Sequence, residues 1–248
     1  MGTRRRWTPV SGRELALALD TATRHPTLAL VGADGAVIDQ RQWLSEHRHG
    51  EQLLQRVEDL LSAAGAIPGD LDAVIVGLGP GSFTGLRIGL ATAKTISYTL
   101  DIPILGIPTT HALALAALAG EAGRNEFAVT LPAGAADRYV HRLLVQEGSV
   151  SESGPPVLAV PGPGFDEAVG DALVIAIDLD GADDISDDAA ERGETALAGL
   201  AQAMASLGTS ALDTGRADDV ERLVPAYVAL PRGIAKAVAE MTWSPDLR

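Results

Sequence analysis

The sequence predicts an α/β protein built around a mixed β-sheet. Short apolar runs bounded by turn residues are typical of strands. They alternate with longer segments in which apolar residues recur every three or four positions, as in a helix. One strand-like run leads directly into a glycine-rich loop and then into a helix and a further strand. That order of elements indicates that part of the sheet is parallel.

The first half opens with three strand-like runs, at 15–19, 27–31 and 36–43. Because turn residues separate these runs, we expect an antiparallel meander. A helix is expected over 50–64, where leucines and a valine recur at helical spacing, and Gly65 is expected to end it.

A buried strand is expected at 73–77, because β-branched and other apolar residues follow one another there without a polar interruption. The glycine-rich loop comes next, and a helix is expected over 84–100. Pro103 interrupts the helical pattern, and a short strand is expected at 104–107. The second half gives a helix at 111–119, strands at 127–131, 139–146 and 173–178, a loop region at 155–164, a helix at 189–207 ending at Gly208, and an extended segment at 223–230.

Composition excludes several classes of protein. The 248 residues include 19 basic and 33 acidic ones, a formal net charge of −14, which disfavours a surface that binds nucleic acid through its phosphates. The absence of cysteine excludes disulfides, thiolate metal sites and a cysteine nucleophile. No apolar segment is long enough for export or membrane insertion, so we expect no membrane association and a cytoplasmic location.

The loop between the buried strand and the next helix is a candidate phosphate site, since backbone N–H groups at a helix start can hold an anion. It does not match a Walker A loop, because Leu86 and Arg87 stand where Lys and Ser or Thr are required. Thr84 stands where the dinucleotide fingerprint requires glycine. A tight structural turn is therefore favoured over an anion site. The loop residues that would serve an anion are Gly79, Gly81, Ser82 and Thr84.

The helix after this loop has one face with almost no side chain, formed by Gly85, Gly89, Ala93 and Ser97. Glycine inside a helix costs about 1 kcal/mol relative to alanine, so a compensating contact is expected. Close approach of another element would supply it through dispersion contacts. The spacing leaves open whether that element is internal, such as the helix at 50–64, or belongs to a second chain.

Four motifs together resemble the TsaB (YeaZ) family: residues 17–23, 50–54, 79–89 and 102–107. The segment 225–230 resembles the closing Pro-x-Tyr segment of that family more weakly. The resemblance implies an actin-like ATPase (ribonuclease-H-like) fold, with two subdomains of mixed sheets and flanking helices. On this basis the chain divides into a flexible N-terminal extension at 1–12, a first subdomain at 13–109, a divergent second subdomain at 110–222 and an extended C-terminal tail at 223–248.

The resemblance also implies a function. Such a chain is a non-catalytic scaffold subunit in the synthesis of N6-threonylcarbamoyladenosine at position 37 of tRNA. It pairs with and activates a TsaD-type transferase, a TsaE-type ATPase joins them, and tRNA is reached through the complex. No cofactor is expected in this chain, with ATP and metal in the partner subunits. Whether the chain forms a homodimer without its partner is left open.

In the family the two helices of the first subdomain form the contact with the TsaD-type subunit. Carried onto this sequence, the interface residues are Gly85, Leu86, Gly89, Leu90, Ala93, Ser97, Leu53 and Val57. Asp20, Thr21 and Thr23 stand where actin-like ATPases have their first phosphate loop. Because no second phosphate motif follows, we interpret them as a vestigial loop in which Asp20 caps nearby backbone N–H groups.

Two other groups of polar residues are candidate metal sites. The acidic run 178–188 lacks EF-hand spacing and is expected to be a solvated loop. His111 has no second histidine four residues away, and His47 and His49 are expected to be solvated, so no metal site is predicted. The alternative functions are an ATP-dependent small-molecule kinase of the same superfold and a metallopeptidase. The missing phosphate motif opposes the first, and the missing ligands oppose the second.

Overall fold

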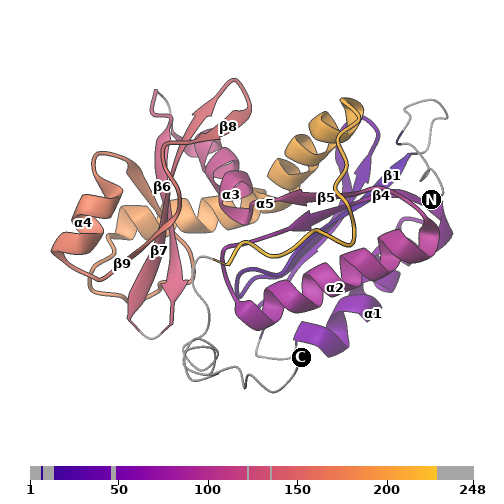
Figure 1. Ribbon diagram of the computed structural model, residues 1–248, viewed down its shortest axis with the longest axis horizontal. Coiled ribbons are helices and arrows are strands. Elements are labelled where there is room, and N and C mark those ends of the chain that lie inside the picture. The colour runs from indigo at the N-terminus through magenta and orange to yellow at the C-terminus, as the bar shows by residue number, and fades with distance from the viewer. Residues whose placement is uncertain (1–6, 8–13, 46–48, 122, 135, 228–248) are drawn as a thin grey trace, which may run out of the picture.

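The computed structural model describes residues 7, 14–45, 49–121, 123–134 and 136–227. Two β-sheets lie side by side, and one long helix packs against strands of both (Figure 1). The expected N-terminal extension, apart from Trp7, lies outside the described residues, as do His47 and residues 228–248 of the expected tail. The subdomain boundaries stay a prediction.

The first sheet has the strand order β3-β2-β1-β4-β5. Its strands are β1 (Leu15–Asp20), β2 (Thr27–Gly32), β3 (Val37–Gln42), β4 (Leu71–Gly77) and β5 (Ile104–Ile107). The first three form the predicted antiparallel meander. β4 pairs in parallel with both β1 and β5, which confirms the mixed sheet.

Strands β1, β2, β4 and β5 of this sheet are buried on both faces, which explains their unbroken apolar runs, whereas β3 is exposed at alternate residues. Successive side chains point to opposite faces. Leu19 packs in the cluster that includes residues of α1 (His49–Ala63) and α2 (Phe83–Leu100), whereas Ala18 packs in the cluster that includes the long helix α5. Figure 1 shows α1 and α2 on one side of the sheet and α5 on the other. The short 3₁₀ helix η1 (Pro68–Asp70) precedes β4.

The second sheet has the order β10-β6-β7-β8, with β9 also paired to β7. Its strands are β6 (Glu126–Ala133), β7 (Asp137–Gln146), β8 (Ser149–Glu152), β9 (Val157–Ala159) and β10 (Leu173–Ala176). β10 runs parallel to β6, and the other pairs are antiparallel. The helix α3 (Thr109–Ala117) and the 3₁₀ helix η2 (Leu118–Gly120) connect the first sheet to β6.

The expected loop region at 155–164 is wrong, because it contains β9 and the start of α4 (Pro163–Val169). Proline fits the first turn of a helix, where its missing N–H leaves no hydrogen bond unmade. Phe165 and Val169 give this short helix a buried apolar face against the second sheet. β8 is likewise not among the expected strands, since its serines and glutamate mask its extended pattern.

Helix α5 (Asp187–Asp213) continues past the expected stop at Gly208, so that prediction is wrong. A Cβ at Gly208 would lie 2.4 Å from Cδ1 of Ile75 in β4. The glycine therefore allows close approach of helix and sheet and does not end the helix. Trp7 is buried near this end, and its indole N–H donates to Asp213 (2.9 Å). Neither α5 nor any other described helix is both long and apolar enough to cross a membrane.

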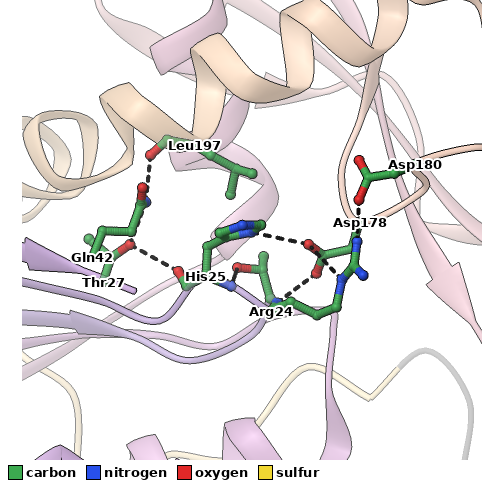
Figure 2. A network of polar contacts seen from close by, with 8 residues as sticks. Arg24, His25, Thr27, Gln42, Asp178, Asp180 and Leu197 are labelled. Carbon is green, nitrogen blue, oxygen red and sulfur yellow. Dashed lines mark hydrogen bonds and ion pairs between the residues drawn. The ribbon is translucent and has the colours of Figure 1, made fainter. Parts of the chain in front are cut away.

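A polar network joins the turn after β1 to the loop after β10 (Figure 2). The backbone N–H of Arg24 donates to Oδ2 of Asp178 (2.7 Å), and the Arg24 guanidinium lies 3.4 Å from Oδ1 of the same residue. Nδ1 of His25 lies 3.3 Å from that oxygen. The side chain of Asp178 is only 7% exposed, whereas that of Asp180 is 77% exposed. The expected solvated acidic loop is thus wrong at Asp178, which links the two halves of the chain.

The segment after α5 returns to the first sheet and covers its edge. The N–H of Asp218 donates to the Ile104 carbonyl (2.8 Å), and its carboxylate accepts from the N–H of Gly106 (2.8 Å). Val220 and Leu223 are buried in the same cluster as α1 and α2. The β5 edge is therefore occupied by the chain itself, which removes an unpaired strand edge.

The contact between α5 and β10 gives the first testable prediction. A Cβ at Gly193 would lie 1.8 Å from the Ala176 carbonyl oxygen, whereas nothing lies within 4 Å of one at Gly164 in α4. We expect Gly193→Ala to lower the free energy of unfolding by about 1–3 kcal/mol or more through overpacking. The control Gly164→Ala should be neutral or slightly stabilising. Urea denaturation of both variants measures this, and equal stability of the two would contradict the packing described for α5.

Candidate functional site

The candidate site begins at the end of β1, where Asp20 is fully buried. Its Oδ1 accepts from the N–H of Ala22 (2.8 Å), and its Oδ2 accepts from the Thr109 hydroxyl (2.6 Å). That hydroxyl oxygen in turn accepts from the N–H of Gly79 (3.0 Å). The network joins the ends of three neighbouring strands, β1, β4 and β5. The expected capping of backbone N–H by Asp20 is confirmed at Ala22.

Burial raises the pKa of Asp20 above its ordinary value, while the hydrogen bonds from Thr109 and Ala22 act in the opposite direction. A Cβ at Gly77 would lie 1.8 Å from Oδ2 of Asp20, so the β4 backbone closes directly over the carboxylate. Both carboxylate oxygens are thus held by the chain itself. They do not face a surface from which a magnesium-bound water could approach.

The turn after β1 packs against the glycine face of α2. The Thr21 hydroxyl donates to the Gly85 carbonyl (2.8 Å). A Cβ at Gly85 would lie 2.1 Å from the Thr21 carbonyl oxygen, and one at Gly89 would lie 2.1 Å from Oγ1 of Thr21. Thr23, also buried, accepts at its Oγ1 from the N–H of His25 (3.0 Å). All three residues of the expected vestigial phosphate loop are therefore engaged within the chain.

The glycine-rich loop makes contacts typical of a tight turn. Gly79 has φ +89°, and a Cβ at Gly81 would lie 2.2 Å from the Ala22 carbonyl oxygen. The N–H of Ser82 donates to that carbonyl (2.7 Å), and its side chain caps α2 by accepting from the N–H of Gly85. Thr84 is exposed inside the helix and does not belong to the loop. The N–H groups of Gly79 and Ser82 are thus already bonded within the chain.

The structure changes the residues assigned to the partner interface. Each of the eight is buried against the chain's own elements, at 6% exposure or less for the apolar ones: Gly85, Leu86, Gly89, Leu90, Ala93, Ser97, Leu53 and Val57. The glycine face packs on the turn after β1 and not on a second chain. An interface on these helices stays a prediction, and it has to be formed by other residues.

The outward face of α2 carries exposed residues instead. Five exposed positions recur at helical spacing along it: Thr84, Arg87, Ala91, Thr95 and Tyr98. Only one of them is charged, in a chain with a net charge of −14. Tyr98 is 74% exposed, and Leu54 on α1 is 57% exposed. The helical spacing of these residues can be read from the sequence. The interface was instead expected on the glycine face, which lies on the opposite side of the helix.

An aromatic cluster stands at the start of this face. The rings of Phe83 and Tyr227 lie 5.3 Å apart, and the Arg87 guanidinium lies 3.9 Å above the Phe83 ring. The N–H of Ala226 donates to the Leu78 carbonyl (2.8 Å) and holds the C-terminal segment against the glycine-rich loop. The Pro-x-Tyr segment therefore belongs to the same surface as the start of α2. Its residues 228–230 lie outside the described part of the chain.

A further group of polar residues was missed by sequence reasoning. His111, in the first turn of α3, lies near His141 of β7 and Glu152 of β8. The three positions are 30 and 11 residues apart, so no local spacing could reveal them. The side chain of His49, at the start of α1, is not among those described.

Comparison with known proteins adds information on family. The family described as TsaD: tRNA N6-adenosine threonylcarbamoyltransferase matches residues 43–153. A tRNA threonylcarbamoyladenosine biosynthesis protein TsaB of Bacillus subtilis is 36% identical over 98 residues, covering 40% of this chain and 42% of the relative. The TsaB of Escherichia coli is 37% identical over 98 residues, with the same coverage of 40% and 42%. An uncharacterized protein of Mycobacterium tuberculosis is 41% identical over 98 residues, covering 39% of this chain and 46% of the relative. The matches thus span less than half the length of these relatives.

Among solved structures, YeaZ from Pseudomonas aeruginosa superposes with a TM-score of 0.67 at 24% identity, over 86% of this chain and 99% of that one. At this identity the likeness establishes the fold. It extends beyond the segment matched by sequence and includes most of the second half. The expected fold, two mixed sheets with flanking helices, is confirmed.

The buried carboxylate of Asp20 gives a prediction about pH. Because the pKa of Asp20 is raised in the folded state, this group stabilises the fold most when protonated, below its ordinary pKa of about 3.9, and that contribution is lost as pH rises through the raised value. Asp20→Asn lacks this titration. We therefore expect the stability of the variant relative to wild type to improve as pH rises from 4, and then to level off. Urea denaturation between pH 4 and 8 tests this, and parallel profiles would contradict it.

Proposed function

We propose that this chain, whose first half resembles TsaB proteins, belongs to the TsaB family and takes part in tRNA threonylcarbamoyladenosine biosynthesis. Within that process we propose a non-catalytic scaffold subunit, which binds and activates a TsaD-type transferase. A TsaE-type ATPase joins the pair, and ATP and metal act in the partner subunits. The names of the B. subtilis and E. coli relatives support a part in threonylcarbamoyladenosine biosynthesis. The outward face of α2, the contacts of Asp20 and the net charge support the role of a scaffold subunit.

The outward face of α2 is the observation that best supports the scaffold role. It is long, exposed and almost uncharged, and it ends in Tyr98. Aromatic residues are enriched and charged residues depleted at the centres of protein interfaces. The face lies on one of the two helices that the family uses for its partner, so we assign the contact to Thr84, Arg87, Ala91, Thr95 and Tyr98.

The end of β1 supports a subunit without nucleotide chemistry. A kinase of this superfold requires an aspartate that faces the magnesium ion of the nucleotide. Asp20 is instead buried. Its Oδ1 accepts a hydrogen bond from the N–H of Ala22, and its Oδ2 accepts one from the Thr109 hydroxyl. In the glycine-rich loop, the N–H groups of Gly79 and Ser82 likewise donate hydrogen bonds within the chain. These contacts favour the scaffold over the ATP-dependent kinase.

Charge supports an indirect relation to tRNA. A net charge of −14 gives unfavourable long-range electrostatics toward a polyanion. We propose that the partner subunits bind the tRNA and that this chain contributes through its contact with the transferase.

The proposed contact gives a prediction with a matched control. Thr95 on α2 and Thr195 on α5 are both exposed, and each hydroxyl donates to the carbonyl four residues earlier. We expect Thr95→Arg to weaken binding to the TsaD-type subunit of the same organism at least tenfold, because it places a long charged side chain at the centre of a nearly uncharged contact. Thr195→Arg should bind like wild type. Isothermal titration calorimetry of the two purified subunits measures both.

Both substitutions are at exposed helical positions, so neither should alter folding, and circular dichroism checks this. Equal affinity of the two variants would contradict the assignment of the contact to the outward face of α2. If wild type itself does not bind a TsaD-type subunit, the scaffold role is wrong.

A further inference from the structure

Two histidines and a glutamate from three elements converge beside α3. His141 precedes Leu143 by two residues on the same face of β7, and Leu143 pairs with Glu152 of β8 in the antiparallel register. The start of α3 packs over these strands and brings His111 to the same place. One ligand atom from each residue lies within 4.8 Å of the other two. The strand register and the helix position thus assemble a group that no local motif encodes.

The facing nitrogens of both imidazoles lack hydrogen-bond partners among the described residues. Nε2 of His111 and Nε2 of His141 are buried and make no close hydrogen bond, and each has Glu152 only at ion-pair distance. They lie 3.5 and 3.6 Å from Oε1 of Glu152, farther than the 2.7–2.9 Å or so of a charge-assisted hydrogen bond. His141 is only 3% exposed. Buried polar atoms are ordinarily satisfied, so a group of unpaired ones that face each other indicates a missing partner.

A neighbouring residue fixes the orientation of His141. Its Nδ1 lies 2.8 Å from Oγ1 of Thr110, which is itself fully buried. If Nδ1 carries the proton and donates to this hydroxyl, Nε2 keeps a free lone pair directed at Glu152. Metal-binding histidines are commonly oriented in this way by a hydrogen bond at the second nitrogen.

We propose that His111, His141 and Glu152 bind one divalent transition-metal ion, with zinc as the best match, and leave a fourth coordination position for water or a small anionic ligand. Nitrogen and carboxylate ligands suit zinc, whereas calcium and magnesium prefer all-oxygen sites. A tetrahedral ion with bonds of about 2.0–2.1 Å needs ligand atoms roughly 3.3 Å apart. The distances of 3.5 and 3.6 Å from Glu152 are close to that value.

This site differs from the expectation of no metal in the chain, which rested on the missing second histidine four residues after His111. The other two ligands, His141 and Glu152, come instead from strands of the second sheet. The other explanation of the cluster is an ion pair between Glu152 and a protonated histidine. The two differ in their response to metal, and neither depends on the proposed partner or pathway.

Direct zinc titration tests the site. The full chain, without a histidine tag and after chelator treatment, is titrated with zinc chloride in the calorimeter. We expect one equivalent to bind, and magnesium chloride to give no comparable binding. Replacement of zinc by cobalt(II) should give the visible absorption of a tetrahedral ion. Absence of stoichiometric zinc binding by wild type would overturn the proposal.

Variants in one hairpin separate this site from adventitious zinc binding. Glu152 is half-exposed at the end of β8, so Glu152→Gln should fold normally, and we expect it to weaken zinc binding at least tenfold. The exposed Glu147, in the turn between β7 and β8, gives the matched control Glu147→Gln, which should bind like wild type. His111→Gln should behave like Glu152→Gln. Equal zinc affinity of Glu152→Gln and Glu147→Gln would assign the metal to other histidines and overturn the proposal.

Discussion

The packing of the glycine face of α2 on the turn after β1 is the contact on which the rest of the first half depends. The backbone oxygen of Thr21 occupies the space that a Cβ atom at Gly85 would need, and its hydroxyl oxygen occupies the space that a Cβ atom at Gly89 would need. The same turn accepts the Ser82 N–H at the Ala22 carbonyl and so fixes the start of the helix. Close approach multiplies dispersion contacts, which offsets the cost of glycine within a helix.

This contact determines how the candidate site is arranged. With one face of α2 committed to the turn, the helix presents its opposite face, which ends in Tyr98, to solvent. The turn also brings Asp20 under the β4 backbone and into its hydrogen bond with Thr109, so the carboxylate expected to belong to a phosphate loop makes internal contacts. Thr110, next in the chain, reaches the second sheet through His141. One short region at the start of α3 therefore links the ends of the first sheet to the proposed metal site.

The elements of the first half could be predicted from sequence because each has a local signal: apolar runs, helical spacing and turn residues. The identity of the element that packs on the glycine face could not, because Thr21 lies more than sixty residues before Gly85 and leaves no trace in its spacing. The predicted end of the helix at Gly208 was wrong for the same reason. Glycine is typical both of a helix end and of a close contact between elements, and the sequence alone does not distinguish the two. The cluster around His141 depends on strand register, which single-residue patterns do not encode.

A double-mutant cycle between Thr21 and Gly89 tests the central contact most directly. A Cβ at Gly89 would meet Oγ1 of Thr21 at 2.1 Å, while the next Thr21 atoms lie 3.3 Å away. Gly89→Ala should therefore destabilise wild type by about 1–3 kcal/mol, and clearly less in a Thr21→Ala background that lacks the hydroxyl. A coupling free energy of about 1 kcal/mol or more, measured by urea denaturation of the four proteins, is the predicted result. Additivity within about 0.5 kcal/mol would contradict the account.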